Sequence, residues 1–205
     1  MSRLDRILAG GLFAAGLAVV VGYGISQTGP AQAQAADGPG PNLVIEIAGQ
    51  ANGTVVIDLL PEVAPKHVAQ IVALARQGAY DNVVFHRVID GFMAQTGDVQ
   101  YGKAGGDLSM AGMGGSAMPD IPAEFTNALS FQRGVVGMAR AQDPNSANSQ
   151  FFITFGDASF LDGQYTIVGN VVSGMEVVDA IKRGDGRNGE VSGAPDVMTR
   201  VTVQE

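Results

Sequence analysis

The feature that most constrains the fold is the length of the apolar segments, which are short throughout the chain after position 42. Glycine, proline, asparagine and aspartate separate them, and valine and isoleucine are frequent within them. Such runs predict β-strands. They are LVIEIAG, GTVVIDLL, VVFHRVI, GFMAQ, GVVGMAR, QFFITF, YTIVGNVV and MTRVTVQ. We therefore expect a mostly β domain, and a closed barrel is the economical way to remove exposed strand edges.

Local patterns predict one hairpin and two helices. The Asn52-Gly53 pair between the first two runs is a strong signal for a tight turn between antiparallel strands. The segment APKHVAQIVALARQG has apolar residues on one helical face and ends in glycine. The segment GMEVVDAIKRG repeats the helical period with Met175, Val178 and Ile181, and its basic end followed by glycine is typical of a helix C-terminus.

The first 36 residues have the layout of a secretory signal. Arg3 and Arg6 precede an apolar run from Ile7 to Ile25, and PAQAQAA then offers two small-x-small cleavage patterns. The run is also close to the roughly 20 residues that span a bilayer, so an uncleaved membrane anchor is the alternative. We expect a periplasmic protein if the leader is removed, and an inner-membrane protein facing the periplasm if it is retained. Residues 37–42, DGPGPN, form a short linker, and residues 43–205 form one domain.

Composition argues against several classes of protein. The absence of cysteine excludes disulfides and a cysteine-linked lipid. The chain has 12 basic and 20 acidic residues, and removal of the leader, which carries a net charge of +1, takes the formal charge from −8 to −9. So acidic a domain predicts no nucleic-acid partner. We expect a monomer that contacts a membrane only if the N-terminal segment is retained.

The residues nominate neither a nucleophile nor a metal or cofactor. His67 and His86 are the two histidines of a chain without cysteine, which argues against a zinc site. GMGGSAMPD lacks the strand-to-helix context of a serine-hydrolase elbow, and GKAGGD lacks that of a phosphate cradle. Methionines in the long loop 100–124 are better explained as gap fillers than as copper ligands. We expect His67 on a solvated helix face and His86 as a hydrogen-bonded histidine of the core or sheet.

One charged residue stands out within an apolar run. Arg87 lies in VVFHRVIDGFMAQTGD, where a guanidinium normally needs a carboxylate because a buried unpaired charge is costly. One interpretation is a structural ion pair with Asp90 or Asp98. The other is catalysis of rotation about an X-Pro amide, whose barrier of roughly 20 kcal/mol comes from amide resonance. In the twisted transition state the prolyl nitrogen becomes a hydrogen-bond acceptor, which a nearby guanidinium would stabilise more than the planar ground state.

Several long motifs together resemble the cyclophilins, which are peptidyl-prolyl cis/trans isomerases. They are FHRVIDGFMAQTGD, GVVGMARAQDPNSANSQFFIT, FLDGQYTIVGNVVSGMEVVDAI and the segment APKHVAQIVALARQGAYDNVVFHRV. The similarity runs from about Leu43 to Gln204. It implies a closed eight-stranded antiparallel β-barrel capped by two α-helices. The implied activity is X-Pro bond rotation in folding exported proteins, through their proline-containing segments, without a covalent intermediate or a cofactor.

The resemblance also implies a role for each residue of the site. Arg87 and Gln95 would be catalytic, and the other positions would bind substrate. The proline ring would be bound by a cup formed by Phe92, Met93, Phe152 and Leu161. Gln95 and Gln150 would position the peptide through hydrogen bonds, and Ala139 and Arg140 would bind its backbone as an added strand. Phe160 and Tyr165 would complete the site.

The sequence departs from the well-known eukaryotic pattern at three of these positions. Phe160 replaces a tryptophan, Tyr165 a histidine and Arg140 an asparagine. Loss of the indole N–H argues against tight cyclosporin binding. No residue of the 100–124 loop can be matched to the family. Alternative hypotheses are a peptide-holding chaperone module with incidental isomerase activity, a hydrolase, or, for the apolar site residues, an ordinary core role.

Overall fold

The computed structural model describes residues 36–186 and 188–205. The predicted signal or membrane anchor therefore lies almost wholly outside the described residues and stays a prediction. Within the described part of the chain, no helix combines the length and the apolar character needed to cross a bilayer.

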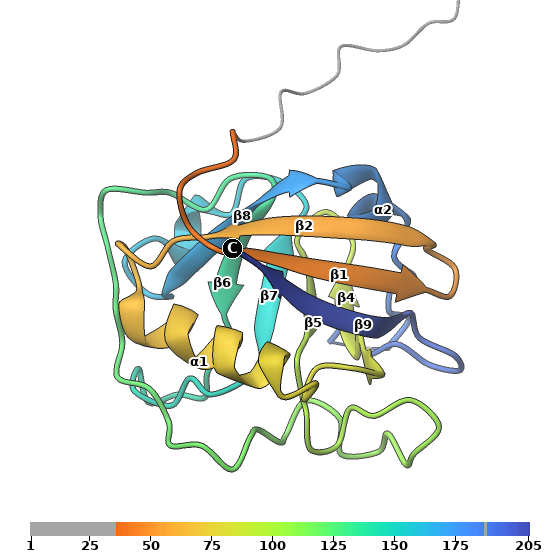
Figure 1. Ribbon diagram of the computed structural model, residues 1–205. Coiled ribbons are helices and arrows are strands. Elements are labelled where there is room, and N and C mark those ends of the chain that lie inside the picture. The colour runs from red at the N-terminus through yellow and green to blue at the C-terminus, as the bar shows by residue number, and fades with distance from the viewer. Residues whose placement is uncertain (1–35, 187) are drawn as a thin grey trace, which may run out of the picture. The chain divides into compact units, whose positions relative to one another are not determined.

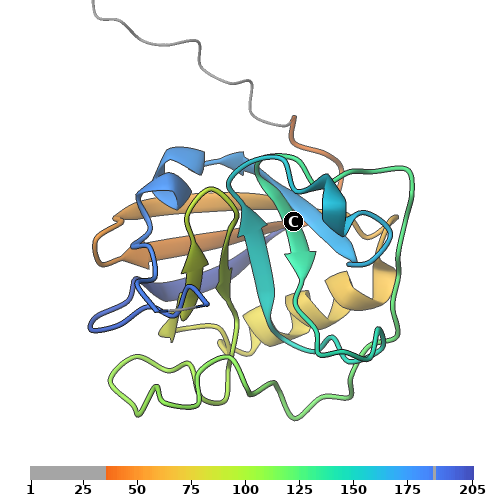
Figure 2. The same ribbon diagram turned by 180° about the vertical axis from the view of Figure 1, so that it is seen from behind.

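The described residues form one curled antiparallel sheet of nine strands with two α-helices and a short 3-10 helix, Ser159–Leu161. The helices are α1 (Pro65–Arg76) and α2 (Met175–Ala180). The strands are β1 (Asn42–Ala48), β2 (Gly53–Leu59), β3 (Val83–Val84), β4 (Arg87–Ile89), β5 (Met93–Thr96), β6 (Val135–Met138), β7 (Phe151–Thr154), β8 (Ile167–Ser173) and β9 (Val197–Gln204). Their order in the sheet is β3-β9-β1-β2-β8-β6-β7-β5-β4. Figures 1 and 2 show the half-barrel that this sheet makes.

The prediction of a closed eight-stranded barrel is wrong. Strands β3 and β4 are the two edges of the open sheet, although only Phe85 and His86 separate them in sequence. Their backbone groups bond to loops: Val84 donates to Gly102 O at 2.8 Å, and Val88 donates to Gly189 O at 2.7 Å. Loops therefore occupy hydrogen-bonding positions that a neighbouring strand would fill in a closed barrel.

The predicted hairpin between the first two strands is confirmed. Strands β1 and β2 pair antiparallel, with Ile47 opposite Gly53. Alternate residues of β1, namely Leu43, Ile45 and Ile47, are buried in the main core. The apolar face of α1 packs into the same core. The alternating apolar residues of the strand and the apolar face of the helix therefore contribute to one hydrophobic core.

The predicted exposure of His67 is wrong, because a distant loop covers the start of α1. The His67 side chain is fully buried, and Nδ1 lies 2.6 Å from Glu124 Oε2. Glu124 also accepts the N–H groups of Lys66 and His67 at 3.1–3.2 Å. The residue at the N-cap is Ala64, which has no side-chain acceptor. A carboxylate 58 residues further along therefore satisfies the helix N-terminus.

The prediction that the second helix ends in a basic last turn, with Lys182 and Arg183, is also wrong. Helix α2 ends at Ala180, and Ile181 adopts an extended conformation with its side chain buried. Asp196 accepts the next N–H, from Lys182, at 2.6 Å, and it also accepts the Ala51 N–H at 2.8 Å. Burial of Ile181 and this buried carboxylate end the helix before the lysine and arginine that follow.

The two buried histidines predict a loss of stability in mild acid. Burial lowers the pKa of His67, and it lowers the pKa of His86 to about 4. Histidines of the unfolded chain take up a proton near pH 6.5, so below this pH the unfolded state binds more protons than the folded state. The free energy of unfolding should therefore fall by on the order of 2 kcal/mol between pH 7 and pH 5.

Urea unfolding at the two pH values measures this change. In the folded protein, ring-proton NMR should show neither histidine titrating near pH 6.5. A normal midpoint for both rings, or equal stability at pH 7 and pH 5, would contradict the prediction.

Candidate active site

A cavity of about 310 Å³ brings together ten of the predicted site residues. They come from four strands or their ends, from the 3-10 helix and from the turn before β8. The lining residues are Arg87, Phe92, Met93, Gln95, Ala139, Arg140, Phe152, Phe160, Leu161 and Tyr165. The eleventh predicted residue, Gln150, lines an adjoining cavity that shares Gln95, Ala139 and Arg140 with the first. The sequence therefore located the cavity, while the role of each residue stays a prediction.

Strand register places the polar residues of the site beside its apolar floor. Strand β5 lies between β4 and β7, and its Gln95 is paired with Arg87 on one side and with Phe152 on the other. Residues directly opposite one another in adjacent strands project to the same face of a sheet. The face that carries the guanidinium and the amide therefore also carries an aromatic ring.

The Arg87 guanidinium is held by carbonyl oxygens. Its Nε donates to Asn188 O at 2.9 Å, and its Nη1 donates to Gln95 Oε1 at 3.2 Å. Within the described residues it makes no salt bridge, and Nη2 makes no hydrogen bond. The side chain is oriented, but donors remain for another acceptor.

The two carboxylates proposed as structural partners for Arg87 are engaged elsewhere. Asp90 Oδ1 accepts from Arg183 Nε at 2.9 Å. Asp98 is buried and accepts four backbone N–H groups at 2.8–3.0 Å. Those donors belong to Gln100, Tyr101, Gly112 and Gly114. The structural ion pair is therefore absent from the described part of the chain.

The apolar part of the cavity has a rigid floor and an exposed rim. Met93, Phe152 and Leu161 are buried and belong to a second apolar cluster, separate from the main core. The Phe152 ring stacks on Phe131 at 5.6 Å. A Cβ at Gly137 would lie 2.6 Å from both rings, so only glycine lets the strand approach them this closely. Rigid aromatic walls of this kind suit a small apolar ring such as that of proline.

The rim consists of two phenylalanines. Phe160 is 63% exposed, and its ring lies 5.3 Å from that of Phe92. An exposed aromatic pair beside a cavity can cover the outer side of a bound ligand. Phe160, which replaces the tryptophan of the eukaryotic pattern, therefore still presents an aromatic face.

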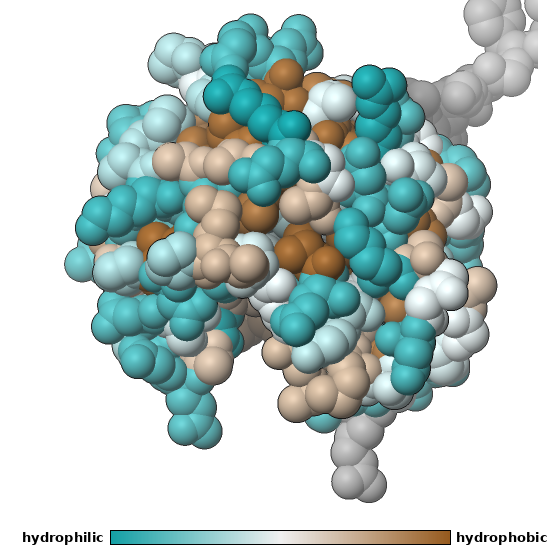
Figure 3. Space-filling view, turned by 60° about the horizontal axis from the view of Figure 1, so that its bottom comes forward, coloured by the Kyte–Doolittle hydropathy of each residue, from teal (hydrophilic) through white to brown (hydrophobic). Residues whose placement is uncertain are grey.

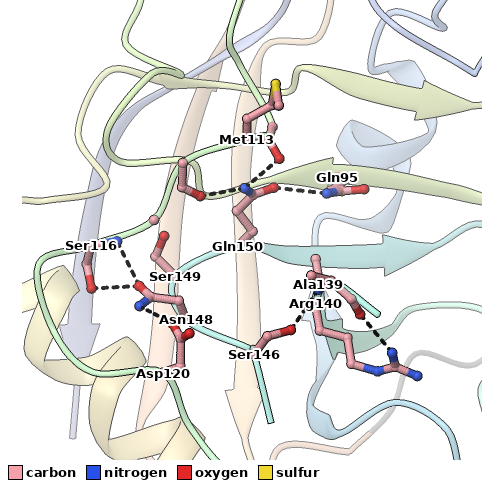
Figure 4. A pocket seen from close by; sticks show the side chains of 14 residues that line it. Gln95, Met113, Ser116, Asp120, Ala139, Arg140, Ser146, Asn148, Ser149 and Gln150 are labelled. Carbon is pink, nitrogen blue, oxygen red and sulfur yellow. Dashed lines mark hydrogen bonds between the residues drawn. The ribbon is translucent and has the colours of Figure 1, made fainter. Parts of the chain in front are cut away.

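The adjoining cavity, of about 540 Å³, lies under the glycine- and methionine-rich loop (Figure 4). Gln150 Nε2 donates to Gly112 O at 3.0 Å and to Gly114 O at 2.7 Å, and its Oε1 accepts from Gln95 Nε2 at 2.9 Å. Because Gln95 in turn accepts from Arg87, a chain of hydrogen bonds joins the loop to the arginine. Figure 3 shows that the face of the molecule turned forward in that view is hollowed and mixes apolar with hydrophilic residues.

Sequence reasoning missed the residues that hold this loop. Asn148 Oδ1 accepts from the N–H and the hydroxyl of Ser116 at 2.7 Å, and its Nδ2 donates to Asp120 Oδ1 at 2.9 Å. Asp98 holds the loop by accepting the N–H groups of Gly112 and Gly114. The unusual length of the loop was the only signal, and it did not indicate which residues make the contacts.

The predicted hydrogen bonding of His86 is not found. The residue is buried, as expected, but neither ring nitrogen makes a well-formed hydrogen bond within the described residues. The ring lies against Gly112, at which an added Cβ would approach Nε2 to 3.0 Å. His86 therefore supports the loop by packing. Among the described residues, no group of three histidine, aspartate or glutamate side chains is placed to hold a metal ion.

Comparison with known proteins identifies the family. The family model described as cyclophilin type peptidyl-prolyl cis-trans isomerase/CLD matches residues 43–203. A protein of Brucella suis biovar 1 (strain 1330), named "Probable peptidyl-prolyl cis-trans isomerase", is 52% identical over 207 residues, covering 100% of this chain and 98% of the relative. The Arabidopsis thaliana peptidyl-prolyl cis-trans isomerase CYP57 is 38% identical over 140 residues, covering 68% of this chain and 26% of the relative.

Solved structures agree with this assignment. The cyclophilin AquaCyp293 from Hirschia baltica has a TM-score of 0.66 and 26% identity, over 82% of this chain and 75% of that one. A Cryptosporidium parvum cyclophilin, crystallised in the presence of the dipeptide Ala-Pro, has a TM-score of 0.68 and 26% identity, over 80% of this chain and 99% of that one. The chain belongs to the cyclophilin-type peptidyl-prolyl cis/trans isomerases, and its enzymatic activity is the isomerisation of X-Pro bonds.

Substitution of Arg87 tests the role that its free donors suggest. Removing a hydrogen-bond donor that acts mainly in the transition state lowers turnover by about 10²–10³-fold, so we expect Arg87→Ala to lower kcat/KM for a proline peptide by this factor. Arg87→Lys should recover only part of the loss, because an ammonium lacks the fork of donors.

A matched control is Arg76→Ala, which removes an exposed arginine at the end of α1. It should leave kcat/KM unchanged. A wild-type rate in a folded Arg87→Ala protein, verified by circular dichroism, would show that the arginine is not catalytic.

Proposed function

We propose that this isomerase accelerates the folding of exported proteins by rotating X-Pro bonds, without a covalent intermediate or a cofactor. The observation that carries the proposal is the oriented guanidinium of Arg87, which lines a cavity with an apolar floor and has no carboxylate partner within the described residues. A donor in this setting interacts with an acceptor that develops during the reaction.

The hydrogen bonds of Arg87 suggest how rotation is promoted. A guanidinium has five N–H groups, and Asn188 O and Gln95 Oε1 engage one on Nε and one on Nη1. When the X-Pro amide twists, resonance is lost and the prolyl nitrogen acquires a lone pair that a remaining N–H can bind. The planar amide offers no such acceptor at nitrogen, so the barrier falls relative to the bound ground state.

The remaining residues would bind the groups on either side of the rotating bond. The buried floor formed by Met93, Phe152 and Leu161 would bind the proline ring. The Arg140 N–H makes no backbone hydrogen bond within the described residues, so it is available to an extended peptide. The Ala-Pro dipeptide used with the Cryptosporidium parvum relative supports a proline-containing ligand for this chain.

The N-terminal sequence supports action outside the cytoplasm. Arg3, Arg6, the apolar run and the small-x-small sites follow the order of a secretory signal. The absence of cysteine suits an oxidising compartment, in which free thiols are liable to oxidation.

Export can be tested by expressing the full-length chain in a Gram-negative bacterium, fractionating the cells and measuring the mass of the protein. We expect a soluble periplasmic protein whose mass corresponds to a start between residues 33 and 37. As a matched control, replacing Ala31, Ala33 and Ala35 with leucine removes both cleavage patterns and should leave a full-length, membrane-bound form. Full-length wild-type protein in the cytoplasm would refute export.

A refolding assay tests the folding role separately. The protein should accelerate the slow, proline-limited phase of a secreted client, which takes tens of seconds uncatalysed, and Arg87→Ala should not. If Arg87→Ala prevented client aggregation as well as the wild type did while the rate of the slow phase stayed uncatalysed in both, peptide holding would replace isomerisation as the cellular role.

A further inference from the structure

The catalytic cavity is positively charged although the protein is acidic. Arg87 and Arg140 both line it, and no aspartate or glutamate does. The chain has 20 acidic residues against 12 basic ones, so two cations facing one small cavity run against its overall composition. The role of Arg87 accounts for one of these charges, and the role of the other is open.

The side chain of Arg140 is fixed in place. Its guanidinium lies over the ring of Tyr165, with 4.6 Å between Cζ and the ring centroid. Nε and Nη2 donate to Gln164 O at 3.2 and 3.0 Å, and Nη1 donates to Ala141 O and Gln142 O at 2.8 and 3.2 Å. A ring and three carbonyl oxygens thus orient the group.

These contacts orient the charge of Arg140 without neutralising it. Carbonyl oxygens and an aromatic face carry partial charges only, and within the described residues no carboxylate lies within 4.0 Å of the guanidinium. Four of its five N–H groups are engaged, and one on Nη2 remains. A guanidinium with a free donor and a net positive charge binds a carboxylate more strongly than a neutral acceptor.

The position of Arg140 places this charge beside the substrate. It lines both the cavity with Arg87 and the adjoining one. Consecutive residues of an extended peptide are about 3.3–3.6 Å apart, so the neighbours of a proline in the first cavity come within reach of Arg140. A carboxylate deep in the larger cavity would instead meet Asp120, which lines only that cavity.

We propose that Arg140 selects substrates that carry an acidic side chain within two residues of the proline, and that Tyr165 holds it in position to do so. Arg140 and Tyr165, which both depart from the eukaryotic pattern, then act together in substrate selection. The inference rests on the proposed placement of proline in the cavity beside Arg87.

Peptides that differ in one residue test the selection. In Ala-Ala-Pro-Ala-Ala, each alanine is replaced in turn by glutamate or by glutamine, which has nearly the same shape without the charge. At one or more of the four positions we expect kcat/KM to be about fivefold higher for glutamate, because partly exposed ion pairs contribute up to about this factor. The ratio should fall in 0.5 M NaCl, where exposed charges are screened.

Variants assign the effect to Arg140. In Arg140→Gln the ratio of glutamate to glutamine turnover should fall to about one, and Arg140→Lys should keep part of it. Arg76→Gln changes the net charge equally but lies outside both cavities, so it should leave the ratio and the basal rate unchanged. Tyr165→Phe retains the aromatic face and should preserve the ratio, whereas Tyr165→Leu should reduce it.

The outcomes separate this inference from the proposed function. Equal turnover of glutamate and glutamine peptides at all four positions, or a ratio that survives in Arg140→Gln, would overturn the role of Arg140 and leave the isomerase intact. Failure to isomerise any of these peptides would overturn both.

Discussion

The register of β5 is the constraint on which the site depends. Its pairing with β4 and β7 sets Gln95 opposite both Arg87 and Phe152, so that guanidinium, amide and aromatic ring share one face. Shifting a strand by one residue would move every side chain to the opposite face. The sheet also holds these three side chains on rigid elements, which positions them better than loops would.

Loops complete what the sheet begins. The buried carboxylate of Asp98 binds the N–H groups of Gly112 and Gly114, and Gln150 binds the carbonyl oxygens of the same two glycines. At these two glycines the irregular backbone is thereby satisfied on both its donor and its acceptor sides, as backbone groups packed against a core require. Because Gln150 also contacts Gln95, the order of the loop and the position of Arg87 are physically connected.

The distribution of charge links stability to function. Carboxylates near the site are committed to other partners: Asp90 to Arg183, and Asp98 to backbone N–H groups. In the proposed mechanism, a carboxylate on Arg87 would stabilise the free enzyme and would have to be displaced before the guanidinium could bind the twisted amide. The uncompensated charge is tolerable because the side chain is partly solvated and its orientation comes from neutral oxygens.

Local patterns in the sequence were sufficient for the elements whose partners are near in the chain. The Asn52-Gly53 hairpin and the apolar face of α1 follow from periods and turn chemistry, and the joint spacing of Arg87, Phe92 and Gln95 pointed to one cavity. Tertiary contacts decided the rest. Glu124 contacts the buried His67 from 57 residues away, Asp196 accepts the N–H of Lys182 after α2, and loops bond the edges of an open sheet. Whether a donor is satisfied or a carboxylate is buried depends on which segments meet in space. Periodic patterns along the chain do not specify these contacts.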